Sequence, residues 1–430
     1  MTDFSIFPSI SLTVSSQRRW VVVGLLSLGM IVAYLSRSNI SVVLAMPDFV
    51  KPFHLSDTDR GTVNSAFFWA YAALQVPAGW LVDRHGVKFP YAFSFAFWCI
   101  VSAGTAFASS IVHLMTLRIL LGAAESLVAP ASIRWIRYNF VEREHGLAVG
   151  LYMTGTKIGP AVAAPLAAWL AMFNGWRVMF LLMGLGGAVW LVPWLLLVKD
   201  DAPHRVNGLT KKAEMNSVPF GRIVASPVTW GTVIATFCYM YYFCMTWMPA
   251  YFVEQRHLSL PRMGLYAFFS FGGMAIVAAL AGWAADLMIA GGRDPVAVRK
   301  WFTIAGFAIA CTELIGAQTS SVALALTFAV VSLSGLGLAT ANYWALTQTL
   351  VPAAAIGRVS GVQNCAASMA GIVAPILTGW LKQLTGSYQA AMQVIWFVLV
   401  AGILSYLLFI RRKYAPGMRA EQSIAIRRFC

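Results

Sequence analysis

The segment GWLVDRHGVK at residues 79–88 has a counterpart, GWAADLMIAGGRDPVAVRK, at residues 282–300. Both copies begin with Gly-Trp, carry an aspartate four residues later (Asp83 and Asp286), and end in basic residues. A glycine permits close helix packing, and trailing Lys or Arg residues hold a loop on the cytoplasmic side of a membrane. The repeat therefore predicts two helical halves with the same internal plan.

Two further matches extend the repeat. The same shift, 203 residues, lays Gly61 on Gly264, and a second shift, 211 residues, lays Trp169 on Trp380. Two shifts that keep their features in sequence order are typical of duplicated bundles, and membrane proteins built in this way bind their ligands where the bundles meet. We therefore expect a site between the two halves.

The composition assigns nearly the whole chain to a membrane. Hydrophobic residues make up 59% of the 430 residues, charged residues make up 11%, and the mean hydropathy is +0.71. A transmembrane helix needs about 20 apolar residues. Such windows lie at 20–45, 61–82, 89–109, 112–134, 146–171, 178–198, 228–252, 263–288, 300–318, 321–345, 356–381 and 388–410. The pattern predicts an all-α polytopic membrane protein with twelve transmembrane helices in two pseudo-symmetric six-helix bundles, and it excludes a soluble protein.

One long polar stretch, residues 199–227, separates the two sets of windows and is expected to be a cytoplasmic linker. The N-terminal bundle is expected at 20–198 and the C-terminal bundle at 228–410. A short cytoplasmic tail is expected at 1–19 and a basic one at 411–430.

The excess of positive charge, 31 Lys and Arg against 16 Asp and Glu, indicates topology rather than nucleic-acid binding. Basic residues concentrate in the tails, the linker and every second loop, which the positive-inside rule assigns to the cytoplasm. We expect a monomer spanning the cell membrane, here a bacterial inner membrane, with both termini cytoplasmic. The six cysteines have no paired spacing, so no disulfide framework, metal site or cofactor is expected.

Ionisable side chains inside membrane spans are costly and mark functional sites. The expected spans contain Arg37, Arg118, Glu125, Lys157 and Glu313. Arg37, Glu125 and Lys157, together with Tyr71, are expected near the midplane. Counting Arg118, basic residues outnumber acidic ones in the spans of the N-terminal bundle. This excess favours binding of an anion. Glu313 lies near the outer end of its span and is expected to extend its carboxylate to the membrane interface.

The second half has no basic residue within a span. Its interior polar candidates are Tyr239, Tyr242, Asn342, Gln363 and Asn364, which are suited to recognise hydroxyl groups. We therefore expect a ligand whose carboxylate faces the first half and whose polar body faces the second half.

Several segments resemble one known family. The paired loops at 79–88 and 282–300 resemble the loop motif of the major facilitator superfamily. Within it, YLSRSNISVVLAMP (34–47), FFWAYAALQVPAGW (67–80) and RILLGAAES (118–126) resemble the anion:cation symporter family, which includes galactonate-type sugar-acid permeases and vesicular glutamate and sialic acid carriers. The resemblance implies a secondary active transporter that takes up an organic anion (a sugar acid, hydroxy acid or other carboxylate) with protons, by alternating access.

The resemblance also implies roles for individual residues. Arg37 would bind the substrate carboxylate, and Tyr71 would lie beside it as a hydroxyl donor. Arg118 would belong both to the substrate site and, with Glu125, to a proton-coupling pair. Lys157 lies outside the family pattern, and two roles stay open for it: neutralising Glu125 or binding a second carboxylate of the substrate.

The paired loops are implied to work as gates, with Asp83, Arg84 and Asp286 contacting protein rather than substrate. Ser36 stands where the sugar-acid permeases usually carry an acid, so one member of their proton relay is missing here. Asp57, in the loop before the second span, is expected to be solvated.

Two alternative functions are considered. One segment approximates the glycine-proline motif of proton-coupled drug exporters in the same superfamily, with Gly146, Gly155, Gly159, Pro160 and the small pair Ala163-Ala164. Export of a drug or metabolite is therefore one alternative. A membrane-embedded enzyme is the other. The chain has no Gly-x-Ser-x-Gly motif and no His, Cys and Asp at metal-ligand spacing, so the sequence favours a transporter over an enzyme.

Overall fold

The computed structural model describes residues 16–140, 142–199, 221, 225–243, 247–351, 353–411 and 414, and within them every regular element is helical. The greater part of the expected N-terminal tail, linker and C-terminal tail lies outside the described residues.

Helices of the first half follow the expected spans closely. They are α1 (Ser16–Val43), α2 (Pro47–Val50), α3 (Asp57–His85), α4 (Lys88–Gly104), α5 (Ile111–Glu125), α6 (Val128–Asn139), α7 (Glu142–Gly187) and α8 (Leu191–Leu197), with 3₁₀ turns at Thr105–Phe107 and Ala188–Trp190. Ser56 starts α3 with a capping box, because its hydroxyl accepts from the backbone N–H of Asp59 while the Asp59 carboxylate accepts from the backbone N–H of Ser56.

The second half repeats this plan. Its helices are α11 (Pro227–Phe243), α12 (Met248–Ala250), α13 (Leu260–Ala290), α14 (Pro295–Ala310), α15 (Glu313–Gln318), α16 (Val322–Leu350), α17 (Ala353–Thr385) and α18 (Gln389–Phe409), with a π-helical segment at Tyr251–Gln255.

Ten helical stretches in the described part of the chain are long and apolar enough to cross a membrane. One of them, Leu147–Leu197, holds two spans, because Gly175 interrupts α7 with a φ of 76° that favours glycine. The helix α3 has the length of a span but is not among the ten. Counting α3 and the second span of Leu147–Leu197 confirms the expected architecture of twelve spans.

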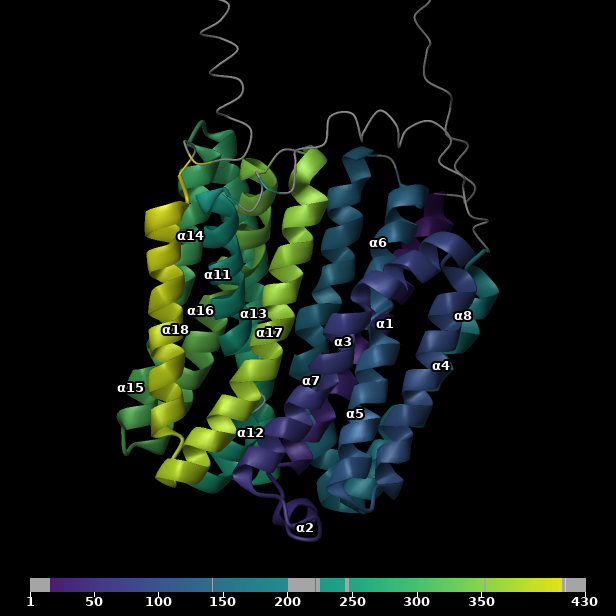
Figure 1. Cartoon of the computed structure of the whole chain (residues 1–430), viewed down its shortest axis with the longest axis vertical. Helices are drawn as coiled ribbons and strands as arrows, with labels where there is room; N and C mark the ends of the chain where they lie inside the picture. The colour runs from purple at the N-terminus through teal and green to yellow at the C-terminus, as the bar shows by residue number, and fades with distance from the viewer. Residues whose placement is uncertain are drawn as a thin grey trace, which may run out of the picture.

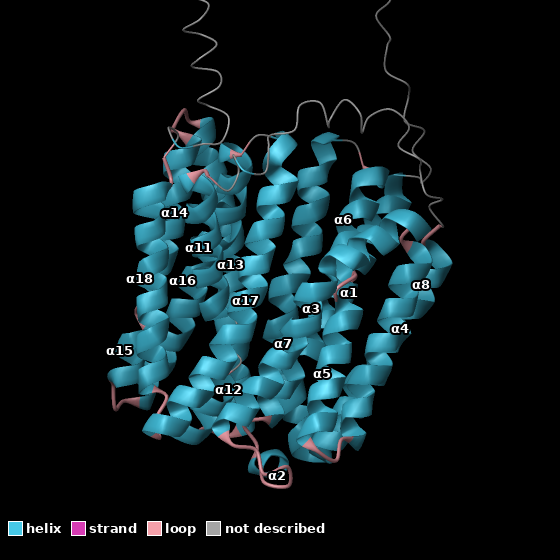
Figure 2. Ribbon diagram, viewed as in Figure 1, coloured by secondary structure: helices cyan, strands magenta, loops and turns pink. Residues whose placement is uncertain are grey.

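The two halves stand side by side, with α1 to α8 on one side and α11 to α18 on the other (Figure 1; Figure 2). Helix α3 of the first half packs on α17, and α7 packs on α13 of the second half. Glycines permit both contacts: a Cβ on Gly264 would lie 2.8 Å from the Cα of Pro165, and one on Gly61 would meet the carbonyl oxygen of Pro375. The repeated pair Gly61 and Gly264 thus has the same structural role in both halves.

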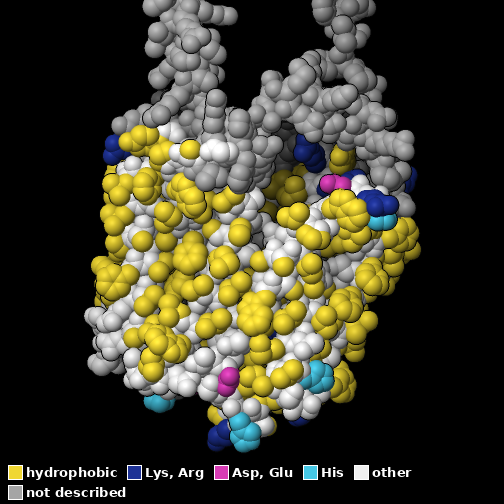
Figure 3. Space-filling model, viewed as in Figure 1, with side chains coloured by type: hydrophobic (Ala, Val, Ile, Leu, Met, Phe, Trp, Pro, Cys, Tyr) yellow, Lys and Arg dark blue, Asp and Glu magenta, His cyan; other side chains and the backbone are white. Residues whose placement is uncertain are grey.

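The outer surface of the helices is apolar. Large side chains such as Phe93, Ile100, Trp283 and Phe397 are more than half exposed, and hydrophobic atoms cover the flanks of both halves (Figure 3). An exposed apolar area of this extent marks a surface that contacts lipid. The same view is hollowed between the two halves near the end opposite α2.

Candidate substrate-binding site

A cavity lies between the two halves, and its lining divides by chemistry. Every polar lining residue comes from α1, α3 or α5 of the first half: Tyr34, Arg37, Ser38, Ser41, Asn64 and Arg118. The second half contributes apolar side chains: Met240, Phe243, Met248, Pro249, Ala267 and Phe271. An anion in this cavity would therefore be bound by the first half and enclosed by the second.

Arg37 and Glu125 form an ion pair beside the cavity. The Nη2 and Nε atoms of Arg37 lie 2.9 Å and 3.3 Å from Oε2 of Glu125. Glu125 is fully buried, whereas the side chain of Arg37 is 16% exposed. The second carboxylate oxygen, Oε1, is buried without a hydrogen-bond partner in the described part of the chain. That oxygen is a free position for a proton.

Aromatic rings surround the Arg37 guanidinium. Its Cζ atom lies 4.6 Å from the ring centroid of Tyr34, 4.4 Å from that of Phe67 and 5.0 Å from that of Tyr71. Contacts of this kind stabilise a cation that has lost much of its water. Tyr71 therefore lies beside Arg37 as expected from the sequence, although its ring, rather than its hydroxyl, makes the contact.

Arg118 makes no ion pair with Glu125 in the described part of the chain. Its Nη2 donates to the carbonyl of Arg37 at 3.0 Å, and its Nη1 donates to that of Ser36 at 3.4 Å. Arg118 and Glu125 are seven residues apart on one helix, which separates them by about 10 Å along the axis. The neighbouring helix α1 therefore supplies the partners of both side chains.

Lys157 of α7 contacts the second half. Its Nζ donates to the hydroxyl of Tyr239 at 3.1 Å and lies 4.3 Å from the ring centroid of Phe243, which lines the cavity. The hydroxyl of Tyr239 also lies 2.8 Å from Oγ1 of Thr340. Of the two roles open to Lys157, neutralising Glu125 has no support among the described contacts.

The polar candidates of the second half are not among the lining residues of the cavity. Asn342 donates to the Leu338 carbonyl of its own helix, and Gln363 donates to the hydroxyls of Thr236 and Thr347. Their amide nitrogens thus bind neighbours inside the second half, while the side-chain oxygens of both residues are buried without a hydrogen-bond partner in the described part of the chain.

Asn364 makes a different contact. Its amide donates to the side-chain oxygen of Gln75 on α3 at 3.0 Å, so it links the two halves. A contact across the halves has to change when they move relative to each other.

Tyr242 belongs to a buried group with Glu313. The tyrosine hydroxyl lies 2.5 Å from Oγ of Ser332 and 3.3 Å from Oε2 of Glu313, and Ser332 donates to the same carboxylate oxygen at 2.6 Å. Glu313 is only 3% exposed. The expectation that it extends to the membrane interface is therefore wrong, because two hydroxyls hold its carboxylate inside the second half.

The expected gate residues lie at the end opposite α2. Asp83 is paired with Arg134 at 2.5 Å, and Asp286 is paired with Arg299 at 3.0 Å. The Arg84 guanidinium packs over the ring of Trp80, with 5.3 Å between its Cζ and the ring centroid. These contacts lie within single halves: the Asp83 pair joins α3 to α6, and the Asp286 pair joins α13 to α14.

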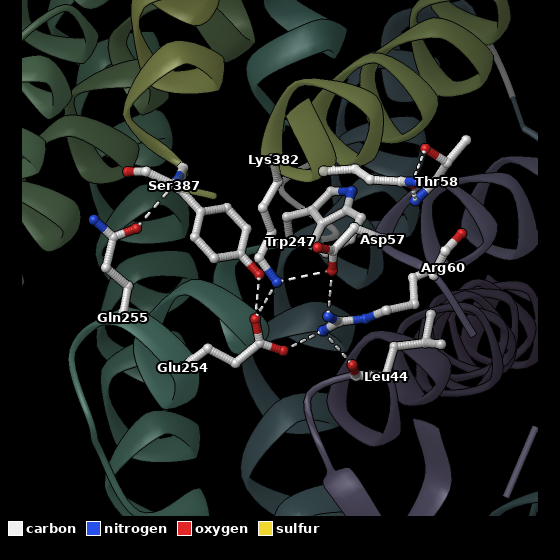
Figure 4. Close-up of polar contacts among 12 residues, drawn as sticks. Leu44, Asp57, Thr58, Arg60, Trp247, Glu254, Gln255, Lys382 and Ser387 are labelled. Carbon is white, nitrogen blue, oxygen red and sulfur yellow. Dashed lines mark hydrogen bonds and ion pairs between the residues drawn. The ribbon is translucent and has the colours of Figure 1, made fainter. Parts of the chain in front are cut away.

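A four-charge cluster, Asp57, Arg60, Glu254 and Lys382, joins the halves at the α2 end (Figure 4). Arg60 contacts Asp57 at 2.8 Å and Glu254 at 2.6 Å, and Lys382 lies 2.8 Å from Asp57 and also pairs with Glu254. Asp57 is thus not a solvated loop residue. Sequence reasoning missed the cluster because its members lie up to 325 residues apart, and no local spacing connects them.

The glycines of the suggested exporter motif have a packing explanation. A Cβ on Gly155 would lie 2.6 Å from the Ser27 carbonyl oxygen, and one on Gly159 would lie 2.5 Å from Cβ of Tyr34. Both glycines let α7 approach α1. Close packing of these two helices accounts for the motif without an export function.

Comparison with known proteins gives a consistent result. The sequence model described as Major Facilitator Superfamily matches residues 26–375. A solved structure described as a bacterial homolog of the human lysosomal transporter Spinster, in an inward-facing and occupied conformation, superposes with a TM-score of 0.75. It is 16% identical and the match covers 94% of this chain and 98% of that chain, so it supports the fold.

Three bacterial relatives match over nearly their full length. A Bacillus subtilis protein named "Probable galactarate/D-glucarate transporter GudP" is 30% identical, with 91% of this chain and 92% of the relative covered. The D-galactonate transporter of Escherichia coli O6:H1 and the hexuronate transporter of Bacillus subtilis are each 27% identical, with 92% of this chain and 96% of the relative covered.

Proposed function

The chain belongs to the major facilitator superfamily, a family of transporters, and we propose that it carries a sugar acid or a similar organic anion into the cell together with protons. The three relatives support the substrate class, since their names specify sugar acids. The polar lining of the cavity supports it too, because Arg37 and Arg118 are positioned there to receive a carboxylate.

The ion pair of Arg37 and Glu125 carries the proposal. While Glu125 is charged, it occupies two donors of Arg37. A proton on Glu125 weakens this pair and leaves the guanidinium available for a substrate carboxylate, which it can bind in a bidentate manner. Binding of the proton and binding of the anion thus favour each other, and such reciprocal linkage is the thermodynamic basis of symport.

Alternating access follows from the two ends of the molecule. The four-charge cluster closes the α2 end, whereas the surface is hollowed between the halves at the opposite end (Figure 3; Figure 4). Transport would proceed by rocking of the halves around the cavity, with the cluster broken when the α2 end opens.

The same proposal gives an orientation. The hollowed end faces the cytoplasm together with both termini, as the distribution of Lys and Arg indicates. The membrane is the inner membrane of a bacterium, in keeping with the bacterial relatives, and the working unit is a monomer, because the cavity is lined within one chain.

A transport assay tests this function. The purified protein is reconstituted in proteoliposomes, and uptake of radiolabelled galactonate, galactarate and glucuronate is measured with and without an inward proton gradient. We expect a gradient-driven accumulation of at least one of them, recovered chemically unchanged, and its abolition by a protonophore. Accumulation that ignores the proton gradient would contradict coupling, and failure of all three to enter would contradict the substrate class.

A further inference from the structure

Lys157 lies at the edge of the cavity without an acidic partner. The ion pairs in the described part of the chain do not include it, and its hydrogen-bond partner is the neutral hydroxyl of Tyr239. On α7 it shares a face with Pro160 and Ala164, three and seven residues further along, and both of these line the cavity. The ammonium group is thus a cation next to the proposed substrate site with no compensating charge of its own.

The packing of α7 against α1 gives the depth of Lys157 relative to Arg37 along the helix axes. Gly155 lies against Met30, and Gly159 lies against Tyr34, so the two helices run in the same direction with a constant offset. By this register Lys157 is level with Val32, five residues before Arg37. At about 1.5 Å per residue, the Cα atoms of Lys157 and Arg37 are offset by about 7.5 Å along the helix axes, so their charged groups extend from different depths.

A six-carbon chain fits this separation. Its five carbon–carbon bonds of about 1.5 Å each span about 6 Å between the two carboxyl carbons of an extended chain, and the carboxylate oxygens extend further at each end. Two carboxylates can therefore reach two cations at different depths, whereas a single carboxylate cannot. Ser38, Ser41 and Asn64 line the cavity on the same half. The Ser41 hydroxyl donates to the side-chain oxygen of Asn64 at 3.3 Å, and the hydroxyl groups of such a chain would bind Ser38 or exchange with this bond.

The charges around the cavity favour the same conclusion. Arg37, Arg118 and Lys157 are basic, and Glu125 is the one acid paired with them in the described part of the chain. Two positive charges are left over, and uncompensated charges at this depth are costly. When Glu125 is protonated, as in the proposed substrate-bound state, three are left over. In either state a dianion compensates one more of these charges than a monoanion does.

We infer that the preferred substrate is a six-carbon sugar diacid, bound with one carboxylate on Arg37 and Arg118 and the other on Lys157. This inference rests on the proposed function and adds the valence of the anion and the residue that selects it. Lys157 is then a specificity residue, which exchanges the Tyr239 hydroxyl for a carboxylate when the substrate binds.

The test uses ligand pairs that differ only at one end. Galactarate is compared with galactonate, and glucarate with gluconate, so that in each pair a carboxylate replaces a hydroxymethyl group. Dissociation constants are measured by isothermal titration calorimetry on the full-length protein in detergent. The variants are Lys157→Met, Lys157→Gln and Lys157→Arg, and the matched control is Lys51→Met, which removes an exposed lysine at the α2 end.

We expect the wild-type protein to bind the diacid of at least one pair more tightly than its monoacid. Lys157→Met and Lys157→Gln should reduce this preference about 10- to 100-fold, as expected for loss of a charge-assisted hydrogen bond. Lys157→Arg should keep most of the preference, and Lys51→Met should keep all of it.

Each other result overturns the inference. If Lys157→Met lowers the affinities for diacid and monoacid equally, or if the wild type prefers the monoacids, Lys157 does not select a second carboxylate, while the proposed function stands. If none of the four compounds binds to the wild type, the sugar-acid function and this inference both fail.

Discussion

Arg60 of α3 and Glu254 of the π-helical segment Tyr251–Gln255 lie 2.6 Å apart, and this ion pair joins the first half of the protein to the second at the α2 end. Arg60 is almost completely buried, with 4% of its side chain exposed, and it also donates to the carbonyl of Leu44. Its guanidinium lies over the ring of Trp247, with 4.8 Å between Cζ and the ring centroid. A buried arginine held by both halves is suited to close one end of a transporter.

The first prediction concerns this closure. Glu254→Gln removes the charge that Arg60 and Lys382 share, so the α2 end should open more often. Loss of about 1–2 kcal/mol corresponds to a factor of about 5–30 in the opening equilibrium. The readout is the rate at which a membrane-impermeant maleimide, added from the α2 side, modifies Ser41→Cys of the cavity lining in a cysteine-free background.

Asp48→Asn is the matched control, because Asp48 is an exposed acid of α2 at the same end. It should leave the rate of modification unchanged. Equal rates in Glu254→Gln and in the parent protein would show that the four-charge cluster does not hold this end closed.

The second prediction concerns anion recognition. Arg37→Lys keeps the charge but loses the planar fork that donates two hydrogen bonds to one carboxylate. Since a hydrogen bond to a charged group contributes about 1.5–3 kcal/mol, uptake should fall about 10- to 100-fold in kcat/KM with normal expression. The exposed Arg262→Lys should transport as the wild type does. Near wild-type uptake by Arg37→Lys would remove Arg37 from the substrate site.

The third prediction concerns coupling. Glu125→Gln mimics the protonated acid, which leaves Arg37 available at every pH. Substrate binding and counterflow exchange in proteoliposomes should persist, whereas uphill accumulation driven by a proton gradient should be lost.

Glu313→Gln is the control for this prediction. It neutralises the other buried acid of the described spans, but its amide oxygen can still accept from Ser332 and Tyr242. Accumulation should therefore survive in Glu313→Gln. Accumulation by Glu125→Gln at the wild-type level would mean that protons are coupled elsewhere or not at all.

The sequence allowed the architecture and the residues near the cavity to be predicted for different physical reasons. Twelve apolar windows are visible because each span has to satisfy its backbone internally and expose apolar side chains to lipid. Charged residues such as Arg37 and Lys157 stand out in these windows because charge is rare at that depth. Both kinds of signal are local in the sequence.

The ion-pair and hydrogen-bond partners of these side chains could not be predicted in the same way. The family resemblance named Arg118 and Glu125 as a coupling pair, but it did not indicate that the ion-pair partner of Glu125 is Arg37, which lies 88 residues away on another helix. Likewise, the polarity of Gln363 within an apolar span indicated that it lies in the interior. Only the packing of the second half shows that its amide nitrogen donates to the hydroxyls of Thr236 and Thr347. Polarity indicates that a side chain is inside, and tertiary packing determines whether it faces a cavity.

The last prediction concerns the repeated glycines, which should control the same motion from both halves. Gly61 meets Pro375 across the contact between α3 and α17, and Gly264 meets Pro165 across the contact between α13 and α7. A leucine at either position would force these helices apart, because overpacking typically costs about 1–3 kcal/mol, and the cost is relieved when the α2 end opens. Both Gly61→Leu and Gly264→Leu should therefore raise the modification of Ser41→Cys from the α2 side, and the double variant should raise it further. Gly24→Leu is the control, since nothing lies within 4 Å of a Cβ at that position. If one of the two variants accelerates modification and the other does not, the halves do not open symmetrically at this end, and the shared role of the two glycines is refuted.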